Sequence, residues 1–139
     1  MKQKNVRSGL LVFTVALLSA CAALQAPTAP VKFSDGVLVS STGMTLYTFD
    51  KDTKGKSTCI DQCASNWPPL KASAEDKPGR GFSILSRDDG SKQWAYDNKP
   101  LYLWVKDQKP GDRTGDGVNK TWHVAAEPAK PDSSGGGGY

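Results

Sequence analysis

Apolar and polar side chains alternate along most of the middle of the chain, with a period of two residues. This alternation is typical of half-buried β-strands, and the β-branched and aromatic residues that favour strands are common within it. The segments that share the pattern are 37–41, 45–49, 82–85, 92–96, 101–105 and 121–125. Short polar stretches separate them, and the first two segments, joined through Gly43, form a predicted hairpin.

Helical periodicity is nearly absent from the chain. No window between residues 32 and 126 keeps helical spacing for more than two turns. One short helical turn is expected over 57–64, with Ser57 or Thr58 as its cap and with two prolines after Trp67 that would end it. The predicted fold is therefore mainly β, a small antiparallel β module that is sandwich-like or barrel-like, with one short helical turn.

Two stretches of the chain repeat each other. Residues 45–52 align with residues 100–107, and both contain the order Leu-Tyr-x-aromatic-x-Lys-Asp. On a strand the tyrosine and the second aromatic residue point to one face, and the aspartate beyond them can accept hydrogen bonds from turn amides or a tyrosine hydroxyl. The motif residues are Tyr47, Phe49 and Asp52 in the first copy and Tyr102, Trp104 and Asp107 in the second. The repeat predicts a pseudo-twofold pair of hairpins, and two interpretations stay open: a core motif, and a pair of aromatic-acidic surfaces that bind a ligand.

The first twenty residues account for most of the net positive charge. The chain of 139 residues has 18 Lys and Arg against 14 Asp and Glu, a formal net charge of +4. Lys2, Lys4 and Arg7 precede an apolar run over 10–18 that is too short to span a membrane. Without this leader 15 basic residues face 14 acidic ones, so the rest of the chain carries only +1. The charge thus indicates export, and nucleic acid is not an expected partner.

The apolar run ends in Leu-Ser-Ala-Cys at residues 18–21, which is typical of a bacterial lipobox. We expect cleavage before Cys21 and acylation of this cysteine, for example with palmitate, which would anchor the protein in a membrane. In a host with two membranes, Ala22 in place of an aspartate indicates the outer membrane. The expected organisation is a signal peptide (1–20), an acylated cysteine with a flexible tether (21–34), a two-repeat β domain (35–126) and a disordered Gly/Pro/Ser tail (127–139).

Further short motifs accompany the two copies. They are Cys-x-x-x-Cys at 59–63, Trp-Pro-Pro-Leu at 67–70, Pro-Gly-Asp at 110–112 and Trp-His-Val at 122–124. Together with Tyr-x-aromatic-x-x-Asp, they resemble the predicted bacterial lipoproteins with the Yx(FWY)xxD motif, also called the secreted repeat of unknown function. The resemblance covers residues 36–126. It implies an extracytoplasmic, lipid-anchored protein of the cell envelope, and it implies no reaction.

Cys59 and Cys63 are the two cysteines that remain once Cys21 is acylated. In an oxidising extracytoplasmic compartment, an even pair at close spacing predicts a disulfide, and no cofactor is then expected. A soft-metal site is the alternative. The two thiolates and His123, the only histidine, are a ligand set suited to copper, provided that the three residues converge in space.

The chain contains none of the local motifs of the common catalytic classes. Gly-x-Ser-x-Gly, a phosphate loop, a dinucleotide fingerprint and His-Glu-x-x-His are all absent from the sequence. We therefore expect a non-catalytic binding or envelope-associated module and no enzyme, with its protein partner and oligomeric state left open. The alternatives are copper handling or electron transfer through the cysteine–histidine set, and glycan or peptidoglycan binding through exposed Tyr47, Tyr102 and Trp104.

Overall fold

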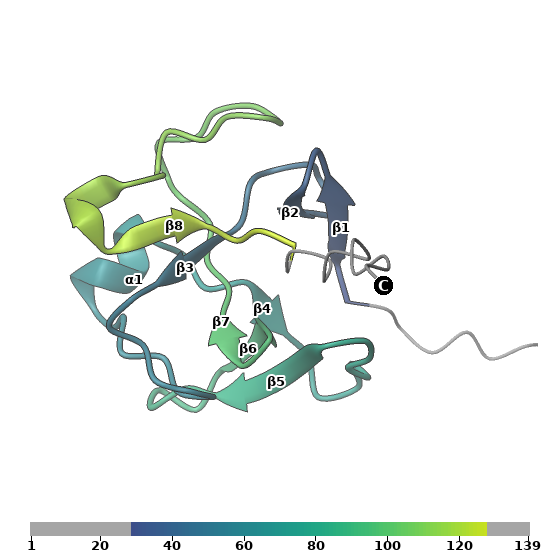
Figure 1. Ribbon diagram of the computed structural model, residues 1–139. Helices are drawn as coiled ribbons and strands as arrows, with labels where there is room; N and C mark the ends of the chain where they lie inside the picture. Colours follow the sequence, from purple (N-terminus) through teal and green to yellow (C-terminus); the bar gives the residue numbers. More distant parts are fainter. Residues whose placement is uncertain (1–28, 128–139) are drawn as a thin grey trace, which may run out of the picture.

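Short β-strands form most of the regular secondary structure of the domain (Figure 1). The computed structural model describes residues 29–127. In chain order the elements are β1 (Val31–Ser34), β2 (Val37–Ser40), β3 (Tyr47–Phe49), α1 (Gln62–Asn66), β4 (Lys71–Ala72), β5 (Phe82–Ser86), β6 (Lys92–Tyr96), β7 (Lys99–Pro100), the 3-10 turn η1 (Val118–Lys120) and β8 (Trp122–Val124). The prediction of a mainly β, antiparallel fold with a short helix is confirmed. The predicted signal peptide, Cys21 and the tail from residue 128 onward lie outside the described residues.

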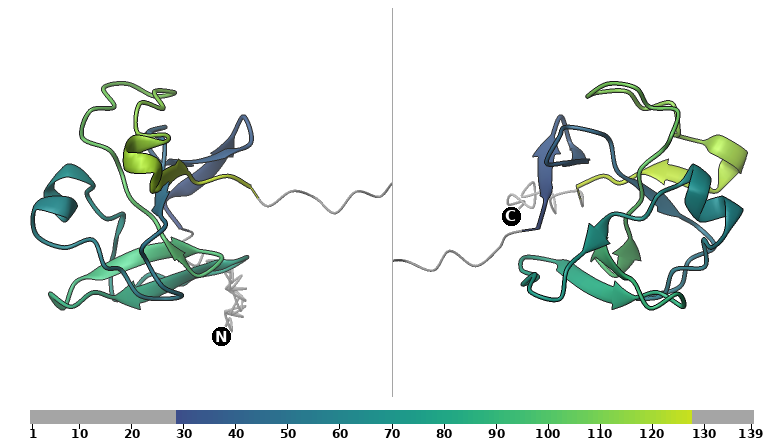
Figure 2. Two further views of the ribbon diagram at one scale, coloured as in Figure 1. Left: turned by 60° about the vertical axis from the view of Figure 1, so that its left-hand side comes forward. Right: turned by 180° about the vertical axis from the view of Figure 1, so that it is seen from behind.

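The strands form three small antiparallel sheets. β1 pairs with β2, and β3 pairs with β8. The third sheet has the order β4-β6-β5, and β7 also pairs with β6. In the orientation of Figures 1 and 2 this third sheet lies below the two smaller ones. The β3–β8 pair joins the strand that begins the first repeat motif to the last strand of the domain.

The first predicted hairpin forms, but its arms make their longest ladders with other strands. The Ser40 N–H donates to the Met44 carbonyl at 2.8 Å across the turn, and the Leu46 N–H donates to the Leu38 carbonyl at 3.0 Å. β2 makes its ladder with β1, and β3 makes its ladder with β8. β1 lies within 21–34, the range assigned to the tether. The domain therefore begins earlier than predicted, because this segment supplies the backbone partners of β2.

The second repeat motif is less regular than the first. The β6–β7 hairpin turns at 97–98, and both turn residues have positive φ. Residues 101–105, which alternation predicts as a strand, do not form one. Tyr102 alone makes isolated bridges in this stretch, one to Tyr47 and one to Pro69, because the chain here crosses between two different partners.

The helix begins later than the sequence predicts. α1 covers Gln62–Asn66 in place of 57–64, and it ends just before the two prolines, as expected. Its N-cap is Asp61, which has a φ of 51° and makes no side-chain capping hydrogen bond. The predicted caps, Ser57 and Thr58, are instead bonded to side chains of the repeat motif.

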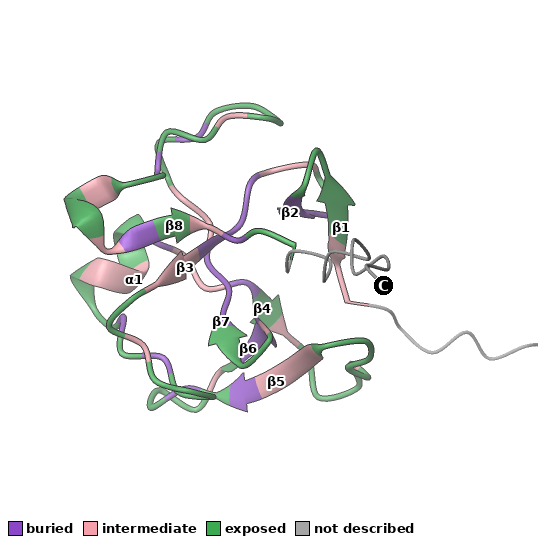
Figure 3. Cartoon of the chain, viewed as in Figure 1, coloured by how far each residue is buried: buried purple, intermediate pink, exposed green. Residues whose placement is uncertain are grey.

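Two clusters of buried side chains form the core (Figure 3). The first is mostly aliphatic and contains Leu38, Leu46, Leu70, Trp94, Leu101 and Ala125. The second is aromatic and contains Tyr47, Cys59, Trp67, Tyr102 and Trp122. The motif tyrosines are therefore core residues. No helix among residues 29–127 is long and apolar enough to cross a membrane.

Candidate functional site

The two copies of the repeat meet at their tyrosines. The Tyr47 N–H donates to the Tyr102 carbonyl at 2.9 Å, and the Tyr102 N–H donates to the Tyr47 carbonyl at 3.0 Å. Both residues have 0% of their surface exposed. This reciprocal pair places equivalent residues of the two copies opposite each other, as a pseudo-twofold arrangement requires.

The tyrosine side chains are also exchanged between the copies. The Tyr47 hydroxyl donates to Oδ2 of Asp107 at 2.6 Å, and the Tyr102 hydroxyl donates to Oδ2 of Asp52 at 2.6 Å. Each tyrosine therefore binds the aspartate of the other copy. The prediction that the motif aspartates accept a tyrosine hydroxyl is confirmed, and the exchange between copies is a new feature.

The second oxygen of each aspartate binds a threonine in the following loop. Oδ1 of Asp52 accepts hydrogen bonds from the N–H and the hydroxyl of Thr58, at 2.7 and 3.0 Å. Oδ1 of Asp107 accepts the same two bonds from Thr114, at 3.0 and 2.6 Å. Both carboxylates thus join a buried tyrosine to a turn, which holds each loop against the core.

Burial controls the protonation of these groups. Burial raises the pKa of Tyr47 and Tyr102 far above the ordinary value of 10.0, and the hydrogen bond to a carboxylate raises each pKa further. Burial also raises the pKa of Asp52, although the hydrogen bonds from Tyr102 and Thr58 lower it. The tyrosine hydroxyls therefore remain donors at neutral pH, and neither tyrosine is poised as a base or a nucleophile.

Four aromatic rings stack face to face in the order Phe49, Trp122, Trp67 and Trp104. The ring centroids are 4.3 Å apart for Phe49 and Trp122, 3.8 Å for Trp122 and Trp67, and 3.9 Å for Trp67 and Trp104. The two central tryptophans are nearly parallel, at 3°. Phe49 and Trp104 are the second aromatic residues of the two motifs, and each stacks on the tryptophan that follows the other motif. We call these four residues the ring stack.

The tyrosines contact the ring stack edge-on. Tyr47 lies at 5.3 Å and 74° from Trp67, and Tyr102 lies at 5.1 Å and 88° from Trp122. The motifs of the sequence do not predict the role of either tryptophan. A signal was present, because each tryptophan follows its tyrosine by twenty residues.

Gly115 closes one side of the aromatic cluster. A Cβ atom at this position would lie 2.8 Å from the Trp67 ring and 2.9 Å from the Tyr47 ring. Its N–H donates to the Tyr47 hydroxyl oxygen at 3.2 Å. Only a residue without a side chain fits this close approach. No pattern in the sequence distinguished this glycine from the others in its loop.

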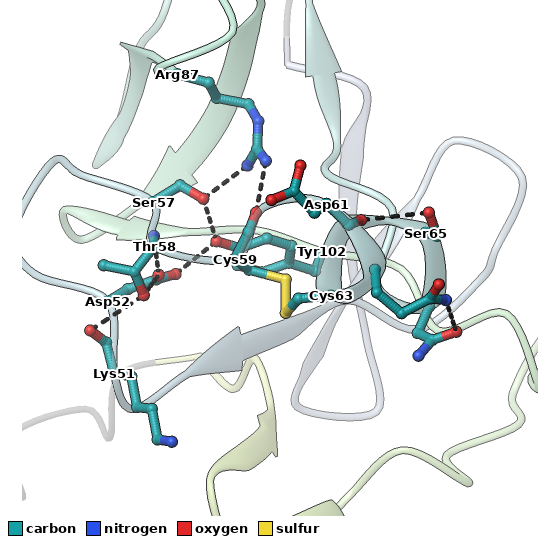
Figure 4. The surroundings of a disulfide bond; sticks show 12 residues. Lys51, Asp52, Ser57, Thr58, Cys59, Asp61, Cys63, Ser65, Arg87 and Tyr102 are labelled. Carbon is teal, nitrogen blue, oxygen red and sulfur yellow. Dashed lines mark hydrogen bonds between the residues drawn. A yellow bond between two sulfur atoms is a disulfide. The ribbon is translucent and has the colours of Figure 1, made fainter.

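A disulfide joins Cys59 and Cys63, with their Cα atoms 5.2 Å apart (Figure 4). The buried side chain of Arg87 lies next to the disulfide segment. Its guanidinium group donates to the Cys59 carbonyl and to Ser57 Oγ, both at 2.6 Å. Ser57 Oγ lies 2.6 Å from the Tyr102 hydroxyl, so a row of hydrogen bonds runs from the buried guanidinium to the Tyr102–Asp52 pair. These partners of Arg87 lie 30 and 28 residues away in the chain, so no local sequence pattern indicates them.

The copper ligand set does not assemble. The disulfide occupies both thiols, so Cys59 and Cys63 offer no thiolate. His123 lies on β8 and pairs with Asp50, with 2.8 Å between Nε2 and Oδ2. Within residues 29–127, no cluster of three His, Cys, Asp or Glu side chains could hold a metal ion. The alternative that needed Cys59, Cys63 and His123 to converge is therefore wrong for this state of the protein.

The exposed-ring alternative also fails for two of its three residues. Tyr47 and Tyr102 are fully buried, because their hydroxyls are bonded to aspartates inside the fold. Trp104 is partly buried at one end of the ring stack, where Lys106 Nζ lies 5.5 Å from its ring centroid. A platform of three exposed rings is therefore absent.

Open surface remains at the other end of the ring stack. A cavity of about 380 Å³ lies where residues from both copies meet, and Phe49 and the tryptophans Trp67 and Trp122 form part of its wall. Asn66 and Thr121, each next to one of these tryptophans in the chain, contribute polar side chains. The wall combines the Phe49 ring and the small exposed parts of Trp67 and Trp122, which are 4% and 2% exposed, with amide and hydroxyl groups and the ammonium group of Lys51. Such a surface can contact a small polar molecule.

A family model described as "Secreted repeat of unknown function" matches the chain twice, over residues 30–71 and over residues 83–126. Each matched stretch contains one copy of the Tyr-x-aromatic-x-x-Asp motif and one of the two central tryptophans of the ring stack. The two copies expected from the internal repeat are thus confirmed. No curated protein and no solved structure matches the chain.

Proposed function

The chain belongs to this family of secreted lipoprotein repeats, and we propose that it is a lipid-anchored, non-catalytic binding module of the bacterial cell envelope. The family is secreted, so the domain is extracytoplasmic. One observation carries the proposal: each motif tyrosine is bonded to the aspartate of the other copy inside the core. The motif residues therefore stabilise the core. We expect a ligand to bind to the surface residues that this core holds in position.

Attachment through Cys21 is the first part of the proposal. It is supported by the Leu-Ser-Ala-Cys sequence at 18–21 and by the lipoprotein character of the family. Several acyl chains would hold the protein stably, because each buried CH₂ contributes about 0.8 kcal/mol. Intact-mass measurement should find a chain that begins at acylated Cys21. The Cys21→Ser variant should stay in the soluble fraction, and an unmodified Cys21 in the native protein would refute the anchor.

The absence of catalysis is the second part. The reactive side chains of the site already have structural partners, since the cysteines are joined and the tyrosines donate to aspartates. His123 is half-exposed, and among the described residues its hydrogen-bond partner is Asp50 rather than a hydroxyl or a thiol. This arrangement supports a binding role because it leaves no activated nucleophile next to the histidine.

The cavity at the junction of the copies is the third part. The Phe49 ring is the part of the stack that is open to a ligand here, because both faces of Trp122 and Trp67 are covered by stacked rings. An aromatic ring next to amide and hydroxyl groups suits a saccharide, whose ring has apolar faces and polar edges. An envelope glycan is therefore the ligand class that we assign to the cavity bordered by Phe49, Asn66 and Thr121. This site replaces the exposed-ring platform expected from the sequence.

The test is co-sedimentation of the detergent-solubilised full-length protein with insoluble peptidoglycan sacculi. We expect the wild-type protein to pellet with the sacculi, and we expect Asn66→Ala and Thr121→Ala to weaken this binding. Gln108→Ala, an exposed polar change outside the cavity, is the matched control and should bind as wild type does. Failure of the wild-type protein to pellet, or equal binding by all variants, would contradict the assigned ligand.

A further inference from the structure

The ring stack and the two tyrosine–aspartate pairs form one continuous path of oxidisable side chains. We propose that the domain uses this path to accept strong one-electron oxidants at its surface and to hold the oxidising equivalent in the core as a tyrosyl radical. This activity is separate from the binding of a glycan. Trp67 and Trp122 border the cavity as well, but the entry point Trp104 and the two tyrosines do not line it.

The path is unbroken from the surface to the tyrosines. Trp104 is in stacking contact with Trp67, and Trp67 with Trp122, at centroid distances of 3.9 and 3.8 Å. Tyr47 and Tyr102 then contact Trp67 and Trp122 edge-on at 5.3 and 5.1 Å. Electron-transfer rates fall exponentially with distance, so rings in direct contact exchange electrons far faster than rings separated by aliphatic packing.

The path has a direction. Its two ends differ, because an indole loses an electron much more readily than a benzene ring, which makes Trp104 the accepting end and Phe49 an insulating end. The ammonium group of Lys106 lies 5.5 Å from the Trp104 centroid, and it disfavours a positive charge on that ring. The carboxylates of Asp52 and Asp107 lie deeper, beside the tyrosines, and they favour positive charge there.

Trp104 also has no base to which it can give its proton. Its Nε1 is buried and has no hydrogen-bond partner among the described residues. An oxidised Trp104 therefore stays a radical cation, and an electron from Trp67 neutralises it. The electron vacancy therefore moves from Trp104 to Trp67 and does not remain at the surface.

Each tyrosine, in contrast, has a proton acceptor in place. Oxidation turns a phenol into a strong acid, so a tyrosine loses its electron and its proton together when a base is hydrogen-bonded to it. The Tyr47 and Tyr102 hydroxyls lie 2.6 Å from carboxylate oxygens. Burial of both hydroxyls keeps them protonated until they are oxidised.

An external one-electron oxidant, such as a peroxyl-type radical or a high-potential metal complex, takes one electron from Trp104, and Trp67 replaces it. Tyr47 then gives one electron to Trp67 and its hydroxyl proton to Asp107, which leaves a neutral tyrosyl radical and a neutral carboxyl group. Tyr102, Trp122 and Asp52 form the equivalent set. An external one-electron reductant restores the tyrosine as the proton returns from the carboxyl group.

The test uses the full-length protein in detergent and a photogenerated ruthenium(III) polypyridyl complex as the oxidant. We expect electron paramagnetic resonance of the wild-type protein to show a tyrosyl radical, which ring-deuterated tyrosine identifies by its altered hyperfine splitting. The Tyr47→Phe/Tyr102→Phe double variant should lose this signal. Tyr96→Phe, which changes a tyrosine outside the ring stack, should retain it.

Trp104→Phe keeps the test decisive if the double tyrosine variant does not fold. Trp104 is partly buried, and a phenylalanine can stack on Trp67 in its place, so this variant preserves the core. We expect it to slow formation of the tyrosyl radical in transient absorption. The proposal is overturned by a tryptophan radical as the only product in the wild type, by a full tyrosyl signal in the folded double variant, or by an unchanged rate in Trp104→Phe.

Discussion

The hydroxyl of Tyr47 lies 2.6 Å from the carboxylate of Asp107, a residue of the other copy of the repeat. The Tyr102 hydroxyl makes the reciprocal contact with Asp52 at the same distance. One copy alone would bury a tyrosine without its acceptor and leave an aspartate without its donor. The exchange therefore explains in physical terms why the motif occurs twice in one domain, since each copy completes the hydrogen bonding of the other.

Double-mutant cycles should detect this exchange. We expect Tyr102→Phe with Asp52→Ala to show a coupling free energy of about 0.5–3 kcal/mol in urea unfolding, because the two side chains share one hydrogen bond. The pair Tyr47→Phe with Asp107→Ala should behave in the same way. Each single change destabilises the domain, since it leaves a buried polar partner unsatisfied.

The matched controls are the pairs within one copy. Tyr47 with Asp52, and Tyr102 with Asp107, share no hydrogen bond in the described structure, so their cycles should show little coupling. Larger coupling within a copy than between copies would contradict the exchanged arrangement.

Gly115→Ala should destabilise the domain. The new methyl group would lie 2.8 Å from the Trp67 ring and 2.9 Å from the Tyr47 ring, and both rings are buried in the core. We expect a loss of about 1–3 kcal/mol in the free energy of unfolding, as is typical of overpacking. Gly79→Ala is the control, because a Cβ there meets nothing within 4 Å. Equal stability of the two variants would show that the aromatic cluster can expand.

Local pattern predicted much of the fold because strands and turns depend on nearby residues. Alternation located the segments that became β2, β3, β5, β6 and β8. Alternation failed at 101–105, where the backbone of Tyr102 has two different partners and no ladder can extend. β1 was missed because its side chains are mostly exposed and only its backbone pairing with β2 defines it.

The sequence predicted which residues form the candidate site, but it did not predict how these residues pair with one another. The aspartates were expected to accept a tyrosine hydroxyl, but which tyrosine binds which aspartate depends on how the copies pack. Arg87 shows the same limit. Its donors reach Ser57 and Cys59, which lie 30 and 28 residues away, and no local spacing encodes such contacts. The equal interval from Tyr47 to Trp67 and from Tyr102 to Trp122 was the one available signal for the ring stack.

Reduction of the Cys59–Cys63 disulfide should lower stability by a modest amount. The bridge closes a very short loop, so its effect on the unfolded chain should be less than the roughly 3 kcal/mol of a 15-residue loop. We expect a lower urea midpoint in the presence of a reductant, and no titratable thiol in the untreated mature protein. The Cys59→Ala/Cys63→Ala variant should not respond to the reductant. Free thiols in the untreated protein would restore the soft-metal alternative.

Alkaline unfolding should follow the ionisation of Tyr47 and Tyr102. Their pKa is raised in the folded state above the value of 10.0 that applies once they are exposed, so above about pH 10 the unfolded chain has lost protons that the folded chain still holds. Their contribution to stability is complete below pH 10 and falls as the pH rises further. We expect tyrosinate absorbance from these two residues only as near-UV circular dichroism is lost, and Tyr47→Phe should remove one of the two late-ionising groups. Ionisation of both tyrosines in a protein that keeps its near-UV signal would contradict their burial and the exchange built on it.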